Sequence, residues 1–525
     1  MNQGRKRQFE RKDIVIAGWV FVCVCSIYLL TMSGWVKSDG YYYYVAAIKL
    51  ASGQRPTIED YRFIDHRTPL SAEGERTTQY GIGWSAALVP IILLSNLLRG
   101  RLYTPPESRV LQMTVSSTTS FISAAAVFLM YLVLRKLGYR RRTCVMIALL
   151  LGFSTMLWTD TRSELFTEPI ATLGITCALL ASIRHRESGN AASAAIAGLC
   201  IAYLTTVKIY WILLIFPFLI LLFQNRSWKR IENLCAFLAP FVIAAGAIVL
   251  YNKVRFGTFV AEGYLGGALT KKAVLQAIKG QPMTVGLYGL LVSPGKGVFL
   301  FNPPLILSLF GAPLFWKESR QLAWFCLIAC GGYVLFFASR PTWDGANFWG
   351  PRHLCPLLPV MMLPAACLLD KVNWRSTRAR IWFGIVTAAG IVIQIPNLFI
   401  QCGTYTGIMV KTGRLRWEEV YFIPNLSPII GNWVLFKDSL VNLVTGEPIF
   451  LYPVKVMRGV TEVLEPVYCV DFENGWDSWI NVVRPAGFMD VLQVKIAVFA
   501  IVALLIMAAI FAGYKIRASL KQDAG

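Results

Sequence analysis

The stretch RKRQFERKDIVIAGWVFVCVCSIYLLTMSGWVKSDGYYYY, residues 5–44, predicts a chain that is built into a membrane. It opens with five basic residues, continues with an apolar run over Ile14–Trp35 and ends at Asp39 and four tyrosines. The run is long enough to cross the hydrocarbon core and lacks an Ala-x-Ala cleavage site, so we expect a retained helix and not a signal peptide. Asp39 then lies at the water–lipid boundary, where aromatic rings also prefer to sit.

The composition of the whole chain supports this prediction. Of its 525 residues 56% are hydrophobic and only 15% charged, and the mean hydropathy is +0.54. A soluble domain is about one quarter charged, so we predict an all-α polytopic membrane protein of about twelve transmembrane helices. The predicted spans are 14–34, 110–134, 143–159, 169–183, 191–207, 209–223, 233–250, 303–316, 321–338, 353–369, 382–400 and 491–513.

The charged residues between these spans indicate the topology. One set of segments, 61 residues in all, holds 24 of the 51 Lys and Arg residues, and by the positive-inside rule this side is cytoplasmic. The set comprises 1–13, 135–142, 184–190, 224–230, 317–320, 371–380 and 514–525. Most of the net charge of +22 is therefore a topology signal and does not point to nucleic acid as a partner.

The outer side receives the three long segments, at about 35–109, 251–302 and 401–490. Within the first, Tyr42–Ser52 reads as a short amphipathic helix that ends at Gly53. Gly81–Leu98 is apolar enough to span, but a crossing there would invert the later loops, so we expect it to lie along the outer interface or to re-enter. Because elaborate loops usually carry function, the protein is expected to work on its outer face.

The expected organisation follows from these spans. Residues 1–13 form a basic cytoplasmic tail, 14–400 the transmembrane region, 401–490 an external loop or small domain, 491–513 the last transmembrane helix and 514–525 a second cytoplasmic tail. Cys402 and Cys469 are the two cysteines well inside an outer loop, and in an oxidising compartment they can pair.

Two acidic residues are candidates for catalysis. Asp39 is one, although an acid at a helix boundary before a glycine is also a common structural arrangement. The second is Glu168, in the short external loop that also carries Arg162 and Glu164. Glu168 before Pro169 equally suits the start of a helix and its dipole.

Four basic residues are candidates for binding a phosphate. Arg352 follows Gly350-Pro351 at the outer end of a span, where it either meets a phosphate with its fork of donors or snorkels to lipid headgroups. Lys253 and Arg255 end an earlier span. Lys296 lies in Ser293-Pro294-Gly295-Lys296-Gly297, which is not a Walker motif because Lys296 is followed by glycine. The three histidines show no zinc-site spacing, and a divalent ion between Asp39 and Glu168 is conceivable without being required.

Several of these stretches together resemble the GT-C glycosyltransferases, in the branch of the protein O-mannosyltransferases and the lipid A aminoarabinose transferase. The resemblance covers about residues 14–400, and 401–490 matches nothing in that family. It departs from the family at Asp39, where many relatives have a second adjacent acid, and at Glu168, where an Asp is frequent. The stretches are Asp39 after the first helix, Tyr80-Gly81-Ile82-Gly83-Trp84, Arg162 with Glu168, Arg255-Phe256-Gly257, Ser293–Gly297 and Gly350–His353.

The resemblance implies an inverting glycosyltransferase of the bacterial inner membrane, with its active site on the external side. A sugar would pass from a polyprenyl-phosphate donor to an acceptor glycan, lipid or protein, with Asp39 as general base. Arg352, with Lys253, Arg255 or Lys296, would hold the donor phosphate, and Tyr42, Arg162 and Glu164 would line the acceptor cleft. No nucleotide or other cofactor is needed. The open alternatives are a lipid or solute transporter or flippase, and a non-catalytic envelope-assembly protein.

Overall fold

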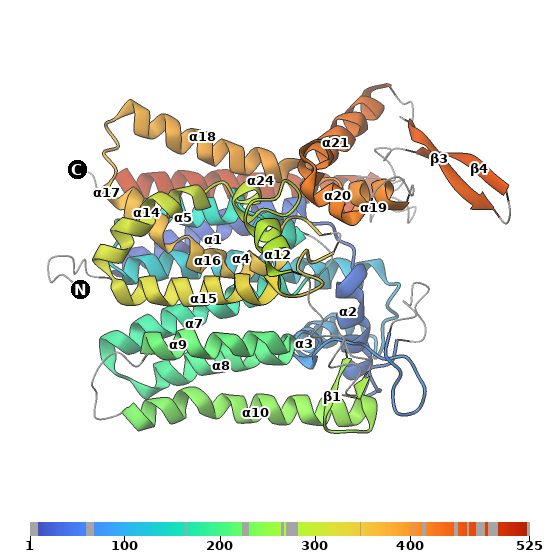
Figure 1. Cartoon of the computed structure of the whole chain (residues 1–525), viewed down its shortest axis with the longest axis horizontal. Helices are drawn as coiled ribbons and strands as arrows, with labels where there is room; N and C mark the ends of the chain where they lie inside the picture. Colours follow the sequence, from blue (N-terminus) through green and yellow to red (C-terminus); the bar gives the residue numbers. More distant parts are fainter. Residues whose placement is uncertain are drawn as a thin grey trace.

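The computed structural model consists almost entirely of helices (Figure 1). The structure describes residues 9–58, 68–162, 165–222, 230–263, 267–268, 282–346, 348–401, 403–411, 416–445, 450–458, 461–468, 478–480 and 492–521. Within these ranges the strands form two small two-stranded antiparallel sheets, β1–β2 and β3–β4. The predicted all-α fold class is confirmed, because the remaining ordered elements are helices.

The long helices lie side by side in one bundle (Figure 1). Each predicted span coincides with a helix or a run of short helices in this bundle. Seven helical segments of the described chain are long and apolar enough to cross a membrane, so the count of twelve stays a prediction. The bundle comprises α1 (Arg11–Thr31), α4 (Arg109–Lys136), α5 (Arg141–Phe153), α7 (Glu168–Ser188), α8 (Ala191–Val207), α9 (Ile215–Leu222), α10 (Arg230–Phe256), α14 (Leu305–Glu318), α15 (Arg320–Ala338), α17 (Leu363–Lys371), α18 (Thr377–Gln394) and α24 (Leu492–Lys521).

Small residues allow the closest helix contacts. A Cβ built on Gly198 of α8 would lie 1.9 Å from the carbonyl oxygen of Phe237 on α10. A Cβ on Gly311 of α14 would lie 2.0 Å from the carbonyl oxygen of Pro364 on α17. Such close backbone approach is how apolar helices gain packing contacts in a membrane, where burial from water does not drive association.

One end of the bundle carries both chain termini and the short connections (Figure 1). There Asp13 is fully buried and accepts hydrogen bonds from Arg135 Nε at 2.8 Å and from Arg141 Nε at 2.7 Å. These two arginines belong to the basic set that predicted the cytoplasmic side. A buried carboxylate is costly unless it is paired with a positive charge. The bonds from Arg135 and Arg141 to Asp13 therefore also connect the start of α1 to α4 and α5.

The opposite end carries the long segments between helices (Figure 1). Here α2 (Ser38–Ala51) crosses the end of the bundle, and α3 (Ile82–Leu98) docks its first turn on the end of α8. A Cβ on Gly81 would lie 2.2 Å from the carbonyl oxygen of Thr206. Leu97 and Leu98 at the far end of α3 are exposed, which fits a helix that lies at the bundle end and not inside it.

The described part of the segment 401–490 contributes three α-helices, the short 3₁₀ helix Pro424–Leu426 and a hairpin at this end. The α-helices and the strands are α19 (Thr404–Lys411), α20 (Trp417–Phe422), α21 (Pro428–Thr445), β3 (Phe450–Arg458) and β4 (Thr461–Tyr468). The segment docks on the turn 293–297, where Ser427 Oγ donates to the Pro294 carbonyl at 2.6 Å and Gly295 N to the Tyr421 carbonyl at 3.0 Å. Cys402 and Cys469 lie outside the described residues.

Candidate functional site

Asp39 stands in the first turn of α2 with one donor on each carboxylate oxygen. The Tyr80 hydroxyl donates to Oδ1 at 2.6 Å, and Arg352 Nη1 donates to Oδ2 at 3.0 Å. The side chain is 23% exposed, so the carboxylate remains accessible from outside the protein. Residues about 40 and 310 positions away in the chain therefore meet at the acid that the sequence singled out.

The neighbours of Asp39 keep it ionised. Burial alone would raise the pKa of this carboxyl, but the Arg352 guanidinium, the Tyr80 hydroxyl and the Lys208 ammonium together hold the pKa below its ordinary value. The group is therefore a carboxylate at neutral pH. It can accept a proton without first having to lose one.

Arg352 is held flat by an aromatic ring. It begins the short 3₁₀ helix Arg352–Leu357, and its guanidinium lies over the Phe348 ring at 3.7 Å and over the Phe166 ring at 5.7 Å. The side chain is largely buried, and stacking of this kind suits a planar cation. Arg352 is thus oriented toward Asp39 and forms a fixed cation beside this carboxylate.

A second ion pair, between Glu168 and Lys208, lies close by, and only Glu168 was predicted from the sequence as a site residue. Glu168, the first residue of α7, accepts from Lys208 Nζ at 3.4 Å, and both side chains are buried (3% and 7% exposed). Lys208 stands directly after α8, where the backbone is extended before Ile209 begins the next short helix. Lys208 also acts electrostatically on Asp39, so the two ion pairs share one charged cluster.

Sequence reasoning missed Lys208 because it was treated as the connection between two spans. The available signal was a lone charged residue between two apolar runs, 191–207 and 209–223. Such a cation must be paired when it is buried. Tyr80 was noticed only as part of a family-like stretch, and its contact with Asp39 could not be seen from its position.

Lys296 is fully engaged with the backbone of the turn before Arg352. Its ammonium donates to the carbonyls of Ala346 and Phe348 at 2.7 Å each and to Gly350 at 3.3 Å. It is 1% exposed and lies over the Tyr421 ring at 4.9 Å. In this structure Lys296 therefore holds the turn that positions Phe348 and Arg352.

Arg255 and Lys253 take different places although they are two residues apart. Arg255 is buried, and its Nη1 donates to the carbonyls of Thr78 at 2.6 Å and Tyr80 at 3.0 Å. Lys253 is exposed, and its ammonium donates to the Gly257 carbonyl at 2.8 Å. Arg255 thus touches the candidate site through Tyr80. The Lys253 ammonium instead lies near Gly257 and over the Phe259 ring.

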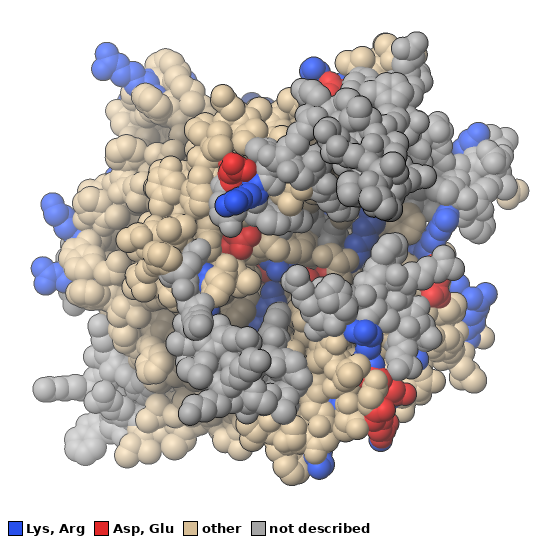
Figure 2. Space-filling view, turned by 45° about the vertical axis from the view of Figure 1, so that its right-hand side comes forward, with Lys and Arg blue, Asp and Glu red and all other residues tan. Residues whose placement is uncertain are grey.

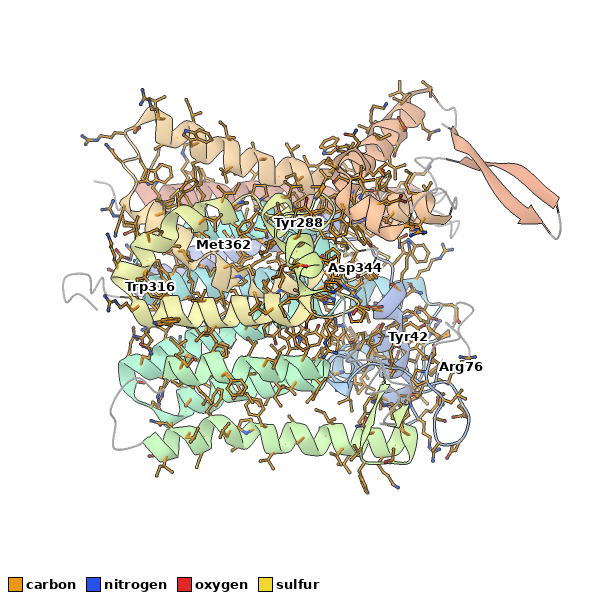
Figure 3. All side chains as sticks on the ribbon, in the orientation of Figure 1. Tyr42, Arg76, Tyr288, Trp316, Asp344 and Met362 are labelled. Carbon is orange, nitrogen blue, oxygen red and sulfur yellow. The ribbon has the colours of Figure 1, made fainter. Side chains whose placement is uncertain are left out.

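The predicted cleft residues are dispersed. Arg162 is buried and donates from Nη1 to the Asn397 carbonyl at 2.9 Å and from Nε to the Thr31 carbonyl at 3.3 Å, which ties three helix ends together. Tyr42 lies at the bundle end that carries α2, with its ring edge-on to Tyr80 at 5.8 Å (Figure 3). Glu164 lies outside the described residues.

The surface at this end is hollowed. Figure 2 shows a recess near the centre of the face, with basic and acidic side chains visible inside it. Among the described residues no group of three or more His, Cys, Asp or Glu side chains is placed to hold a metal ion. The arrangement offers one accessible carboxylate, a stacked arginine beside it and a buried Glu–Lys pair behind it. Such a set can take a proton and stabilise an anion.

No protein-family model matches the chain, and no curated protein matches it either. Two similar solved structures are of ArnT from Cupriavidus metallidurans. The structure bound to undecaprenyl phosphate is 14% identical over 81% of this chain and 76% of that chain, with a TM-score of 0.45. The apo structure is 13% identical over the same shares, with a TM-score of 0.44. A third is the archaeal oligosaccharyltransferase AglB from Archaeoglobus fulgidus, in complex with an inhibitory peptide and a dolichol-phosphate. It is 14% identical over 78% of this chain and 58% of that chain, with a TM-score of 0.42.

Proposed function

We propose that the chain is a membrane glycosyltransferase that moves a sugar from a polyprenyl-phosphate donor to an acceptor at the external face of the membrane. The observation that carries the proposal is the partly exposed Asp39 carboxyl hydrogen-bonded to Arg352, whose guanidinium lies over the Phe348 ring. Both lie at the bundle end that receives all the long segments. The order of family-like stretches in the sequence adds independent support.

In the proposed reaction Asp39 is the general base. It accepts the proton of an acceptor hydroxyl or amine while that atom forms a bond to the anomeric carbon of the sugar. The bond between the anomeric carbon and the phosphate oxygen breaks on the opposite face, and its electron pair leaves with the polyprenyl phosphate. A single displacement of this kind inverts the anomeric centre.

Arg352 supplies the electrostatic part. The leaving phosphate gains negative charge as the bond breaks, and a preoriented guanidinium next to it stabilises that charge. Phosphate is an adequate leaving group once stabilised, so no separate general acid is needed. Glu168 and Lys208 remain paired behind this centre and contribute to its field.

A transporter fits the placement of these groups less well. Transporters bind their cargo near the bilayer midplane, with ionisable groups inside the bundle. Here Asp39 stands in the first turn of α2, Glu168 begins α7 and Lys208 follows the last residue of α8, so the charged cluster stands at helix ends. Sites at the end of a bundle suit chemistry on a substrate anchored in the membrane.

The test replaces the base in the native cells and reads the lipids and glycans by mass spectrometry. With Asp39→Asn we expect a polyprenyl-phosphate sugar to accumulate and one envelope glycan, lipid or protein to lack that sugar. Purified variant protein should turn over roughly a hundredfold or more slowly, as for a lost general base. Asp344→Asn is the matched control, because Asp344 lies at the same end (Figure 3) and outside the contacts of Asp39.

Wild-type lipids and glycans in the Asp39→Asn cells, with the variant protein present in the membrane, would remove the proposed activity. The accumulating lipid identifies the sugar, and the depleted molecule identifies the acceptor.

A further inference from the structure

Tyr80 is the most firmly fixed neighbour of the candidate base. Its ring is stacked on Tyr43 with centroids 4.7 Å apart and an interplanar angle of 25°, and it is 3% exposed. Its hydroxyl donates to Asp39 Oδ1 at 2.6 Å. Tyr43 and Asp39 both belong to α2, so Tyr80 contacts this helix twice, by ring stacking on Tyr43 and by the hydrogen bond to Asp39.

The backbone at Tyr80 is also held, by hydrogen bonds from Arg255. Arg255 donates to the carbonyls of Thr78 and Tyr80 from one nitrogen, and its Nη2 donates to Asn252 Oδ1 at 2.9 Å. Its guanidinium lies 4.0 Å over the Tyr251 ring. Arg255, Asn252 and Tyr251 all belong to α10. This helix therefore holds the backbone at Tyr80 in place through the guanidinium of Arg255.

Two close backbone contacts further restrict the turn 78–81. A Cβ on Gly81 would lie 2.2 Å from the Thr206 carbonyl oxygen, and one on Gly263 would lie 2.2 Å from the Gln79 carbonyl oxygen. The turn 78–81 is thus packed against α8 and the segment after α10, with no room for a Cβ at Gly81 or at Gly263. A hydroxyl carried by such a turn has little freedom to follow Asp39 if the carboxylate moves.

Each carboxylate oxygen of Asp39 accepts a hydrogen bond from a different side chain. Oδ1 meets the fixed Tyr80, and Oδ2 meets Arg352. If Arg352 stabilises the donor phosphate, as in the proposed function, its bond to Oδ2 weakens when the donor is bound. The bond from Tyr80 to Oδ1 has no reason to change.

We propose that Tyr80 is the positioning residue that holds Asp39 through Oδ1, so that Oδ2 faces the acceptor when Arg352 turns to the donor phosphate. Arg255 is the clamp that keeps Tyr80 in place. The acceptor proton then passes to Oδ2. This inference rests on the proposed function, and it reassigns Arg255 from the phosphate to the support of the base.

The test measures the transfer rate of purified protein against pH in Tyr80→Phe. The phenyl ring keeps the stack on Tyr43 and loses only the hydroxyl. We expect kcat to fall roughly tenfold, the value for a lost hydrogen bond to a charged group, with KM for the polyprenyl-phosphate sugar unchanged. The acid limb of the rate profile should move to higher pH, because the lost bond favoured the charged carboxylate.

The matched control is Tyr44→Phe. Tyr44 also belongs to α2, but its hydroxyl donates to the Pro106 carbonyl at 3.2 Å and not to the carboxylate. Its rate profile should coincide with that of the wild type. A purely structural role of buried tyrosine hydroxyls around α2 would affect both variants alike.

A double variant and a second substitution give independent readouts. In Asp39→Asn the further change Tyr80→Phe should have little effect on the residual rate, because Tyr80 acts through the carboxylate. Arg255→Lys keeps the charge but not the fork, so its acid limb should move in the same direction as that of Tyr80→Phe. Wild-type profiles in both single variants, or a full additional loss in the double variant, would overturn the inference. Absence of transfer by the wild type would instead count against the proposed function.

Discussion

Replacing Lys296 by methionine separates a phosphate ligand from a support of the site. Methionine keeps the length of the side chain and removes the ammonium that donates to the carbonyls of Ala346, Phe348 and Gly350. If these bonds are what Lys296 provides, the variant should lose stability, because the turn before Arg352 is left with unsatisfied carbonyls in a buried place.

The magnitude follows from the geometry. The Ala346 carbonyl keeps the Tyr421 hydroxyl as a donor, so the carbonyls that lose their bond to the ammonium without this second donor are those of Phe348 and Gly350. Each buried acceptor left without a partner costs about 1–3 kcal/mol, and the bond to Gly350 is the longer of the two at 3.3 Å. Removing the buried ammonium recovers part of its own desolvation, which offsets some of this loss. A net loss of roughly 2–4 kcal/mol is expected. For a chain of this length that corresponds to a fall of about 2–4 °C in the thermal midpoint.

The assay is thermal unfolding of the purified protein in detergent, with binding of a polyprenyl-phosphate sugar measured on the same samples. Lys253→Met is the control, because Lys253 is exposed and donates to the single Gly257 carbonyl at 2.8 Å. Its unfolding free energy should change by less than about 0.5 kcal/mol. An unchanged thermal midpoint in Lys296→Met, together with lost donor binding, would refute the support role and restore Lys296 as a phosphate ligand.

Three further outcomes are expected. Arg352→Lys should turn over well below the wild type, because an ammonium keeps the charge but loses the planar stack on Phe348, and wild-type turnover would reduce Arg352 to a headgroup anchor. Because the pKa of Asp39 is held below the ordinary 3.8, the wild-type rate should persist as pH falls from neutrality and be lost only through that lowered pKa; a limb near neutral pH would contradict Asp39 as the base. In intact cells an impermeant thiol reagent should label Asn425→Cys above the parent level and not Arg140→Cys, and the reverse pattern would place Asp39 on the inner side.

The bundle could be predicted because a membrane leaves the chain few choices. Long apolar runs such as 14–34 and 321–338 must satisfy their own backbone groups, and only helices do so within one segment. The observed α1 (Arg11–Thr31) and α15 (Arg320–Ala338) follow those runs within a few residues. The end of the bundle at which Asp39 lies could be predicted for the same reason, since the long polar segments have to leave the apolar layer.

The partners of the site residues could not be predicted in the same way. Lys296 and Arg255 meet carbonyls of residues about 50 and 175 positions away, and every residue has a carbonyl. A basic residue in a glycine-rich turn therefore looks the same in sequence whether it binds a phosphate or a neighbouring turn. The cost of an unmatched guanidinium predicted a phosphate as the partner of Arg352, and the structure pairs Arg352 with Asp39. The bond from Tyr80 had no signal in spacing or composition.

The backbone around the site departs from what its residues prefer, and this also explains the limit of local reasoning. The non-glycine residues with positive φ in the described chain are Ser38, Leu165 and Ala346, at 50°, 61° and 62°. Ser38 precedes Asp39, Leu165 precedes Phe166, and Ala346 stands two residues before Phe348. Each such conformation costs about 1–3 kcal/mol and persists only where tertiary contacts impose it.

Those contacts are visible at two of the three positions. The Leu165 carbonyl accepts from Trp84 Nε1 at 3.1 Å, and the Ala346 carbonyl accepts from Lys296 Nζ and from the Tyr421 hydroxyl. The partners come from the first, second and third long segments in turn. The strained turns that present Phe166 and Phe348 to Arg352 are therefore fixed only after all three segments have docked. No single stretch of sequence could disclose that geometry, because the site is a product of the assembled bundle end.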